Sequence, residues 1–247
     1  MYSVHCNYTY DINVYIPTSP TPAEGFAVLF VLDGQRYSKM IYEAMENQLK
    51  ISQKTKVTPM IIVSIGHQSE DAHERRFYDF TPPASQYEFP TRRGKKMPEI
   101  PVGNGETFKL FIELELLPWL NEHYDVNNSQ YALFGHSLGG LYTLYLFLQY
   151  PNLFHRYVAV SPSIWWNNKQ LLNLLVEKET APTQPLAIYV GGDEGDMIDD
   201  ASAFQKTMFS QKKQMDFYIA MNENHASVIP TTISRAFRFI SKDSFKL

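Results

Sequence analysis

Short runs of apolar residues alternate along this chain with longer segments in which apolar residues recur every three or four positions. A short continuous apolar run is typical of a strand buried on both faces, and the longer spacing is typical of an amphipathic helix. Buried strands that alternate with such helices predict an α/β fold, with a mostly parallel sheet covered by helices on both faces. The predicted strands are Ala27–Leu32, Met60–Ile65, Tyr131–Phe134, Tyr157–Val160, Leu186–Val190 and Asp216–Ala220.

Helical spacing is clearest in two segments, from Phe108 to Leu120 and from Leu141 to Leu148. Proline is common just after a helix and in its first turn, so Pro151 is expected to end the second helix and Pro230 to open a last one. The residues through Ile16 alternate weakly, as an antiparallel edge hairpin does. Neither a repeat nor a linker divides the sequence, and residues 1–247 are therefore expected to form a single domain.

The segment from about residue 71 to 105 lacks clear periodicity and contains five prolines and a basic cluster at residues 91–96. A stretch of this length inside a compact domain is usually a functional excursion or a mobile loop. The sequence therefore predicts a long loop excursion here. The basic cluster itself is more typical of a solvated face than of a binding site.

The net charge and the cysteine content indicate which partners the protein can bind and where it acts. With 22 basic and 26 acidic residues the formal net charge is −4, which argues against nucleic acid or an anionic membrane as the main partner. The single cysteine, Cys6, cannot form an internal disulfide, and the first residues lack the basic start and apolar stretch of a signal peptide. No apolar run is long enough to cross a bilayer. A cytoplasmic protein is expected.

The pattern Gly-x-Ser-x-Gly, formed by Gly135, Ser137 and Gly139, lies directly after a predicted strand and directly before a predicted helix. A sharp strand-to-helix turn holds such a serine in a strained conformation that exposes its hydroxyl, and side chains at the glycine positions would collide. The first amides of the helix face the reaction centre, so the Leu138 N–H is expected to bind the oxyanion. This context favours Ser137 as a nucleophile over a serine that only caps a helix.

A serine hydroxyl is a poor nucleophile unless a base accepts its proton. In hydrolases of this architecture the order along the chain is nucleophile, acid, histidine. Of the seven histidines, only His155 and His225 follow Ser137, and His155 comes directly after the nucleophile's helix. His225 follows the last predicted strand, at the edge of the sheet where the active site of such a fold lies, and is predicted to be the base.

The acid is expected after the strand Leu186–Val190, where three carboxylates follow two glycines. Its role is to hold the imidazole in the required tautomer. The Gly-x-x-acid spacing favours Glu194, while Asp193, Asp196 or a Ser–His pair without a carboxylate stay open as alternatives.

A second oxyanion donor is expected in the loop after the strand Ala27–Leu32. Gly34 lets the backbone turn toward the serine, so the N–H of Gly34 or of Gln35 is predicted to be this donor. A simple tight turn at Asp33-Gly34 is the alternative.

Two segments carry a specific resemblance: Arg-Arg-Phe-Tyr-Asp-Phe-Thr-Pro at residues 75–82 and Ser-Pro-Ser-Ile-Trp-Trp at residues 161–166. Four less specific segments add to it, namely Leu32-Asp33-Gly34, residues 135–141, the acidic turn 191–196 and residues 225–230. In these segments the chain resembles the putative-esterase branch of the α/β-hydrolase superfamily. Within that branch it is similar to bacterial siderophore esterases of the ferri-bacillibactin and enterobactin/salmochelin type. Antigen-85-like acyltransferases and S-formylglutathione hydrolases fit the two specific segments less well.

The resemblance implies a metal-independent serine esterase with no cofactor. Ser137 would be acylated by a small-molecule ester, for which a ferric siderophore is a candidate, and water activated by His225 would then release the acid. The chain departs from the family at residues 101–106, where relatives often carry a plainer glycine run, and at Ala226, where glycine is common.

Other residues are candidates for binding the substrate. Arg75 and Arg76, beside Tyr78, are predicted to grip an anionic substrate such as a ferric catecholate complex. Trp165 and Trp166 are predicted to form an aromatic wall, with core packing as the alternative, and one of each is expected. One set of polar residues fits no standard zinc spacing and is not predicted to bind metal: His67, Asp71, His73 and Glu74.

The leading hypothesis is a serine esterase acting on a catecholate siderophore trilactone or a related ester. A general carboxylesterase or thioesterase is the first alternative, because one fold hosts many chemistries. A hydrolase-fold protein that only binds a ligand is the alternative from another class.

Overall fold

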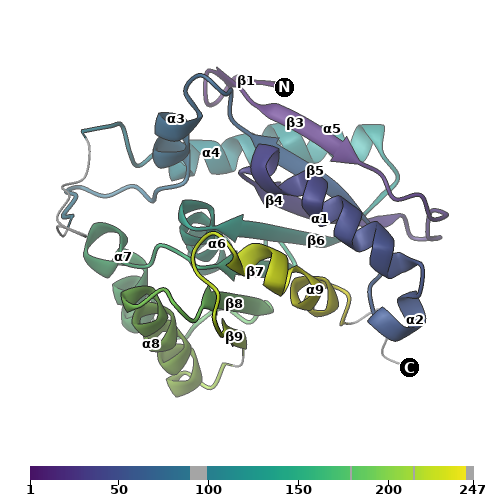
Figure 1. Ribbon diagram of the computed structural model, residues 1–247. Helices are drawn as coiled ribbons and strands as arrows, with labels where there is room; N and C mark the ends of the chain where they lie inside the picture. Colours follow the sequence, from purple (N-terminus) through teal and green to yellow (C-terminus); the bar gives the residue numbers. More distant parts are fainter. Residues whose placement is uncertain (90–98, 179, 214, 243–247) are drawn as a thin grey trace.

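The structure is a computed structural model that describes residues 1–89, 99–178, 180–213 and 215–242 (Figure 1). Within these residues, seven strands form the main sheet and two short strands form a separate antiparallel hairpin. The strands are β1 (Tyr2–Ser3), β2 (Tyr8–Thr9), β3 (Asp11–Tyr15), β4 (Phe26–Leu32), β5 (Met60–Gly66), β6 (Val126–His136), β7 (Arg156–Val160), β8 (Leu186–Gly191) and β9 (Asp216–Ala220).

The main sheet has the order β3-β5-β4-β6-β7-β8-β9. The edge strand β3 pairs antiparallel with β5, and all the other neighbours are parallel. Every residue of β4, β5 and β8 is buried, as expected for strands covered on both faces. The predicted mostly parallel sheet is therefore confirmed.

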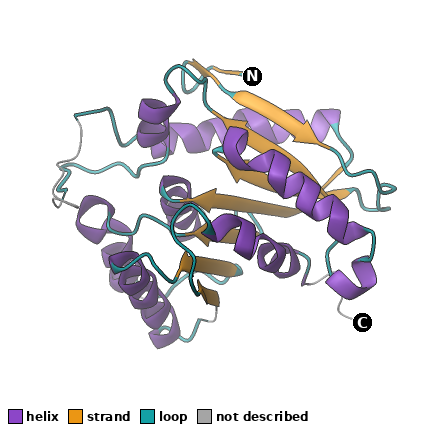
Figure 2. Cartoon of the chain, viewed as in Figure 1, coloured by secondary structure: helices purple, strands orange, loops and turns teal. Residues whose placement is uncertain are grey.

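Helices cover both faces of this sheet (Figure 2). On one face, Ile41 of α1 and Ile233 of α9 join a single apolar cluster, and these two helices contact each other. On the other face, Leu144 of α6 and Phe204 of α8 belong to a second, larger cluster. The helices are α1 (Gly34–Leu49), α2 (Ser52–Thr55), α3 (Ala72–Asp79), α4 (Gly105–Phe111), the π-helical η1 (Ile112–Leu116), α5 (Leu117–His123), α6 (Leu138–Gln149), α7 (Trp166–Glu177), α8 (Asp196–Ser210) and α9 (Val228–Ile240).

Several helix and strand boundaries differ from the sequence predictions. The first five residues of β6, Val126–Gln130, are not buried, so they carry no apolar run to reveal them. The predicted helix from Phe108 to Leu120 contains the π-helical turn η1, and α9 begins two residues before Pro230. The predicted loop excursion contains the helix α3, and its basic cluster at residues 91–96 lies outside the described residues.

The strand order explains where a site is expected. From β4 the chain passes to β5 on one side and later to β6 on the other, so the direction of winding reverses between β4 and β6. In open parallel sheets, ligands bind outside the carboxyl ends of the strands at this reversal point. Asp33 follows β4 there, and Ser137 follows β6.

Among the residues that the structure covers, no helix is both long enough and apolar enough to cross a membrane.

Candidate active site

Ser137 forms the turn between β6 and α6. Its backbone angles, φ 59° and ψ −116°, lie in a region that L-residues rarely adopt, which costs about 1–3 kcal/mol unless neighbouring contacts hold it. Those contacts are present: the Ser137 N–H donates to Val160 O at 3.0 Å, and its carbonyl accepts from Leu141 N–H at 2.9 Å. The strained serine at the head of a helix agrees with the sequence prediction.

The glycines around Ser137 are required to different degrees. A Cβ atom at Gly135 would lie 2.1 Å from the carbonyl oxygen of Gly139, whereas a Cβ at Gly139 would lie 3.3 Å from Leu32 Cβ. Gly140, which is outside the sequence pattern, is also tight, with Pro162 Cα 3.0 Å from such an atom.

Replacing Gly135 by alanine is expected to lower the free energy of unfolding by about 3 kcal/mol, because the new methyl group must displace backbone. Gly139→Ala is the matched control and is expected to cost clearly less, since alanine also favours the helix. Urea denaturation measures both variants. Equal stability of Gly135→Ala and wild type would contradict this description of the turn.

His225 and Glu194 meet above the carboxyl ends of β8 and β9. Nδ1 of His225 lies 2.6 Å from Glu194 Oε2, and the Glu194 carboxylate is buried. Burial alone raises the pKa of Glu194, but hydrogen bonds from His225, Ser161 and Gly191 outweigh it and the pKa is lowered. The carboxylate therefore accepts the Nδ1 proton, which leaves Nε2 as the basic nitrogen.

Of the three carboxylates on the acidic turn, Glu194 alone is buried, while Asp193 and Asp196 are exposed. The structure thus brings together His225 and the carboxylate that the spacing favoured. His155 lies just before β7, where its Nδ1 accepts from the N–H of Tyr131, midway along β6, at 3.4 Å.

His225 packs against the residue next to Ser137. The ring of His136, the residue before Ser137, lies 4.4 Å from the ring of His225 between centroids, and in Figure 1 the yellow segment before α9 curls over the start of α6. Within the described residues, the hydrogen-bond partner of Ser137 Oγ is Ser163 Oγ at 3.5 Å, and no hydrogen bond joins Ser137 to His225. Catalytic hydrogen bonds commonly tighten only when a substrate binds.

Two helix N-termini supply the candidate oxyanion donors. Leu138 begins α6, and Gly34 and Gln35 begin α1. The first amides of a helix have no partner within it, and in the described part of the chain these three N–H groups donate to no other acceptor. Their assignment to an oxyanion site stays a prediction.

His136 was not singled out by the sequence. It is 5% exposed, its Nδ1 lies 3.1 Å from the Tyr37 hydroxyl, and burial, followed by the charge of His225, lowers its pKa to about 3. His136 is therefore a neutral ring at neutral pH, packed against His225.

This depressed pKa predicts how stability depends on pH. Between pH 6.5, the ordinary histidine value, and about 3, the unfolded chain binds a proton that folded His136 does not, so stability falls as the pH falls. From pH 7 to 5, wild type is expected to lose ~2 kcal/mol more than His136→Gln. The measurement is urea unfolding at both pH values, with the exposed His123→Gln as control. Parallel losses in wild type and His136→Gln would contradict the expectation.

The two arginines predicted to bind substrate are engaged inside the protein. Arg75 Nε donates to Asp79 at 2.8 Å. Arg76 binds the fully buried Asp33 through two hydrogen bonds of 2.9 and 2.7 Å. Burial raises the pKa of Asp33, but the Arg76 charge outweighs it and the pKa is lowered. Both guanidinium groups are thus already paired with carboxylates inside the protein. That either arginine binds an anionic substrate stays a prediction.

The two tryptophans differ in burial, as predicted: one lies in the core and the other is partly exposed. Trp166 is fully buried and packs against Phe77 and Phe89 in the core, so its prediction as a substrate-binding residue is corrected. Trp165 is partly exposed. Tyr78 is also partly exposed, with the Arg75 guanidinium 5.1 Å from its ring centre.

Two of the four polar residues that fit no zinc spacing, His67 and Asp71, have partners within the protein. His67 Nε2 lies 3.1 Å from Asp79 in the interior, and Asp71 accepts from the Tyr8 hydroxyl. Within the residues that the structure describes, no group of three or more metal-ligating side chains comes together.

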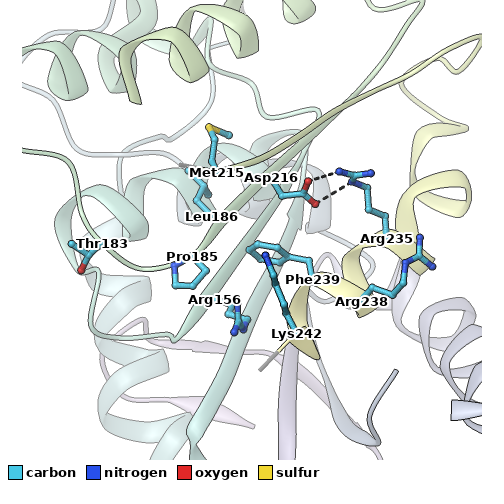
Figure 3. A pocket seen from close by; sticks show the side chains of 10 residues that line it. All are labelled: Arg156, Thr183, Pro185, Leu186, Met215, Asp216, Arg235, Arg238, Phe239 and Lys242. Atoms are coloured by element: carbon cyan, nitrogen blue, oxygen red, sulfur yellow. Dashed lines mark hydrogen bonds and ion pairs between the residues drawn. The ribbon is translucent and has the colours of Figure 1, made fainter. Parts of the chain in front are cut away.

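A cavity of about 660 Å³ lies away from these groups, where β7, β8 and β9 begin (Figure 3). Arg235 turns toward Asp216 and binds it, whereas Arg238 and Lys242 extend in different directions from the end of α9. Since the predicted nucleophile, base and acid lie at the opposite edge of the sheet, this cavity is not the candidate active site.

Comparison with known proteins identifies the family of this chain. The family described as putative esterase matches residues 3–234. The ferri-bacillibactin esterase BesA of Bacillus subtilis is 34% identical over 94% of this chain and 85% of its own length. The crystal structure of the BES protein from Bacillus cereus is 34% identical, covers 97% of this chain and 93% of its own, and has a TM-score of 0.86.

A more distant structure shares the fold. The enterobactin hydrolase IroE in complex with DFP is 22% identical, covers 95% of both chains and has a TM-score of 0.72. The expected resemblance and the expected α/β-hydrolase fold are both confirmed. This chain therefore belongs to the putative esterase family and is an ester hydrolase with the α/β-hydrolase fold.

Proposed function

We propose that the protein is a serine hydrolase that opens the ester bonds of a catecholate siderophore trilactone, with Ser137, His225 and Glu194 as its triad. The observation that carries the proposal is the 2.6 Å contact between His225 Nδ1 and Glu194, beside a strained serine at the head of α6. An imidazole held by a carboxylate is the base that such a serine needs in order to lose its proton during attack.

In the first half of the reaction, Ser137 Oγ attacks the ester carbonyl carbon while Nε2 of His225 accepts the hydroxyl proton. Glu194 stabilises the imidazolium that forms. The negative charge on the former carbonyl oxygen is bound by the N–H of Leu138 and by that of Gly34 or Gln35, which belong to two helix N-termini. The C–O bond then breaks, and His225 returns the proton to the leaving alkoxide.

In the second half, water attacks the acyl group on Ser137. His225 takes a proton from this water and then gives it to Ser137 Oγ as the acid leaves. The same three side chains serve both steps, and the described residues supply every proton acceptor that the cycle needs.

The substrate class rests on the relatives and on one side chain. The Bacillus subtilis relative is named for ferri-bacillibactin, and IroE is named for enterobactin. Trp165 is partly exposed two residues after Ser163, which itself lies beside Ser137. A partly exposed indole offers a flat apolar face on which a catechol ring can stack.

The test is a comparison of kcat/KM for ferric and iron-free enterobactin, p-nitrophenyl acetate and an acyl thioester. Specificity is the ratio of the kcat/KM values of two substrates. We expect kcat/KM for the trilactone to exceed that for the other esters by at least about 100-fold. A preference for p-nitrophenyl acetate or the thioester would identify a general carboxylesterase or a thioesterase. Folded protein that hydrolyses none of them would indicate a binding protein.

The proposal also concerns the chain as a whole. Residues 1–247 would work as one domain, because both apolar clusters lie on the faces of one sheet. The protein would act in the cytoplasm, which agrees with a single buried cysteine that cannot form an internal disulfide. Cell fractionation tests the location.

A further inference from the structure

Two buried serine hydroxyls lie beside the proposed triad without belonging to it. Ser161 and Ser163 flank Pro162 directly after β7, and their exposed fractions are 0% and 2%. A buried hydroxyl must find a hydrogen-bond partner or lose free energy. Ser161 contacts the acid of the proposed triad, and Ser163 contacts its nucleophile.

Ser161 binds the acid. Its hydroxyl donates to Glu194 Oε1 at 2.5 Å, and the N–H of Gly191 donates to the same oxygen at 2.7 Å. The other oxygen, Oε2, faces His225 Nδ1. With two donors on Oε1, the carboxylate cannot rotate without losing both, so Oε2 stays aimed at the imidazole.

Ser163 binds the nucleophile. Its N–H donates to Ser137 O at 3.1 Å, and its Oγ lies 3.5 Å from Ser137 Oγ. Within the described residues, that oxygen is the hydrogen-bond partner of the Ser163 hydroxyl. Ser163 therefore contacts both the backbone and the side chain of the residue that must attack.

The backbone between these serines is held in an unfavourable shape. Ser161 has φ 42°, in the left-handed region that favours glycine, and its N–H donates to Tyr189 O at 2.7 Å. Pro162 lies against Gly140 of α6, where even a methyl group would be tight. Such strain persists where the surrounding structure fixes it, and it clusters at functional sites.

We propose that Ser161-Pro162-Ser163 is a positioning segment that sets both ends of the triad from one rigid turn. Ser161 fixes the Glu194 carboxylate for His225, and Ser163 holds the Ser137 carbonyl and places its own hydroxyl beside that of Ser137. This inference rests on the proposed function, because positioning has a consequence only if the triad reacts.

The two serines are expected to have different kinetic signatures. Ser161→Ala lowers kcat about 10- to 100-fold, the value of a hydrogen bond to a charged group. Without this donor the carboxylate becomes more basic, so the acid limb of the pH–kcat/KM profile moves to higher pH. Ser163→Ala lowers kcat and the rate of fluorophosphonate labelling, while the acid limb stays in place.

Ser161→Gly keeps the test valid if the alanine variant folds poorly. Glycine adopts φ 42° without strain and still removes the hydroxyl, so it should show the same shift of the acid limb. The matched control is Ser241→Ala, another buried serine, whose hydroxyl contacts Thr58 far from the triad. It is expected to leave kcat and the pH profile unchanged.

A spectroscopic readout separates positioning from general damage. The His225 Nδ1 proton, identified in the proton NMR spectrum by its loss in His225→Ala, is expected to shift in Ser161→Gly and to stay in place in Ser163→Ala. An unchanged resonance and acid limb in both Ser161 variants would overturn the role of Ser161. Wild-type kcat and labelling rate in Ser163→Ala would overturn that of Ser163. Wild-type protein that neither hydrolyses esters nor takes the label would instead contradict the proposed function.

Discussion

Ser137→Ala is expected to lower kcat by about 10³-fold or more, because the proposed acyl-enzyme forms on the Ser137 hydroxyl that this substitution removes. The substitution removes one oxygen atom and keeps a residue with a Cβ in the same strained turn. The fold and the affinity for substrate should therefore change little. Steady-state kinetics on the preferred ester measure the loss, and thermal unfolding checks the fold.

The activity that remains in Ser137→Ala also bears on the mechanism. Binding and oxyanion stabilisation alone can leave measurable catalysis over water, so a small residual activity agrees with the account. Ser241→Ala, a buried serine outside the site, should keep wild-type kcat. Activity within about tenfold of wild type in well-folded Ser137→Ala would mean that another group is the nucleophile.

His225→Ala is expected to produce a loss as large as that of Ser137→Ala, because an unassisted hydroxyl barely attacks an ester. The double variant Ser137→Ala/His225→Ala should be no worse than either single variant, since residues that act as one unit are not additive. Glu194→Gln should cost less, roughly 10-fold less than His225→Ala, since the acid only orients and stabilises the imidazole.

These variants also distinguish the open alternatives for the acid. A Glu194→Gln variant with wild-type kcat would favour a Ser–His pair or one of the exposed carboxylates, Asp193 and Asp196. Multiplicative losses in the double variant would show that Ser137 and His225 act independently, against the account. His155→Gln, just before the first residue of β7, is the control histidine and should retain activity.

The sheet could be predicted well because its strands are buried on both faces. β9 has the predicted bounds, and β4, β5, β7 and β8 each differ from theirs by one residue. The start of β6 was missed because residues 127–130 are polar and none of residues 126–130 is buried. Burial creates the apolar run, so an unburied stretch of strand leaves no signal.

Some features of the helices and of the site could not be predicted from a single sequence. The π-helical turn η1 keeps nearly the apolar spacing of an α-helix, so periodicity did not reveal it. The arginines at 75 and 76 looked free for substrate because their partners, Asp79 and Asp33, are set by tertiary contacts. Ser161 and Ser163 carried a family resemblance in the sequence, and their hydroxyl partners emerge only from the packing of the turn after β7 against Glu194 and Ser137.

The central claim is that His225 activates the hydroxyl of Ser137. A fluorophosphonate reacts with an activated serine, and peptide mass spectrometry locates the adduct. We expect wild type to carry a single adduct on Ser137, and folded His225→Ala to carry little or none at the same exposure. An adduct on a different residue, or labelling of His225→Ala at the wild-type rate, would contradict the claim.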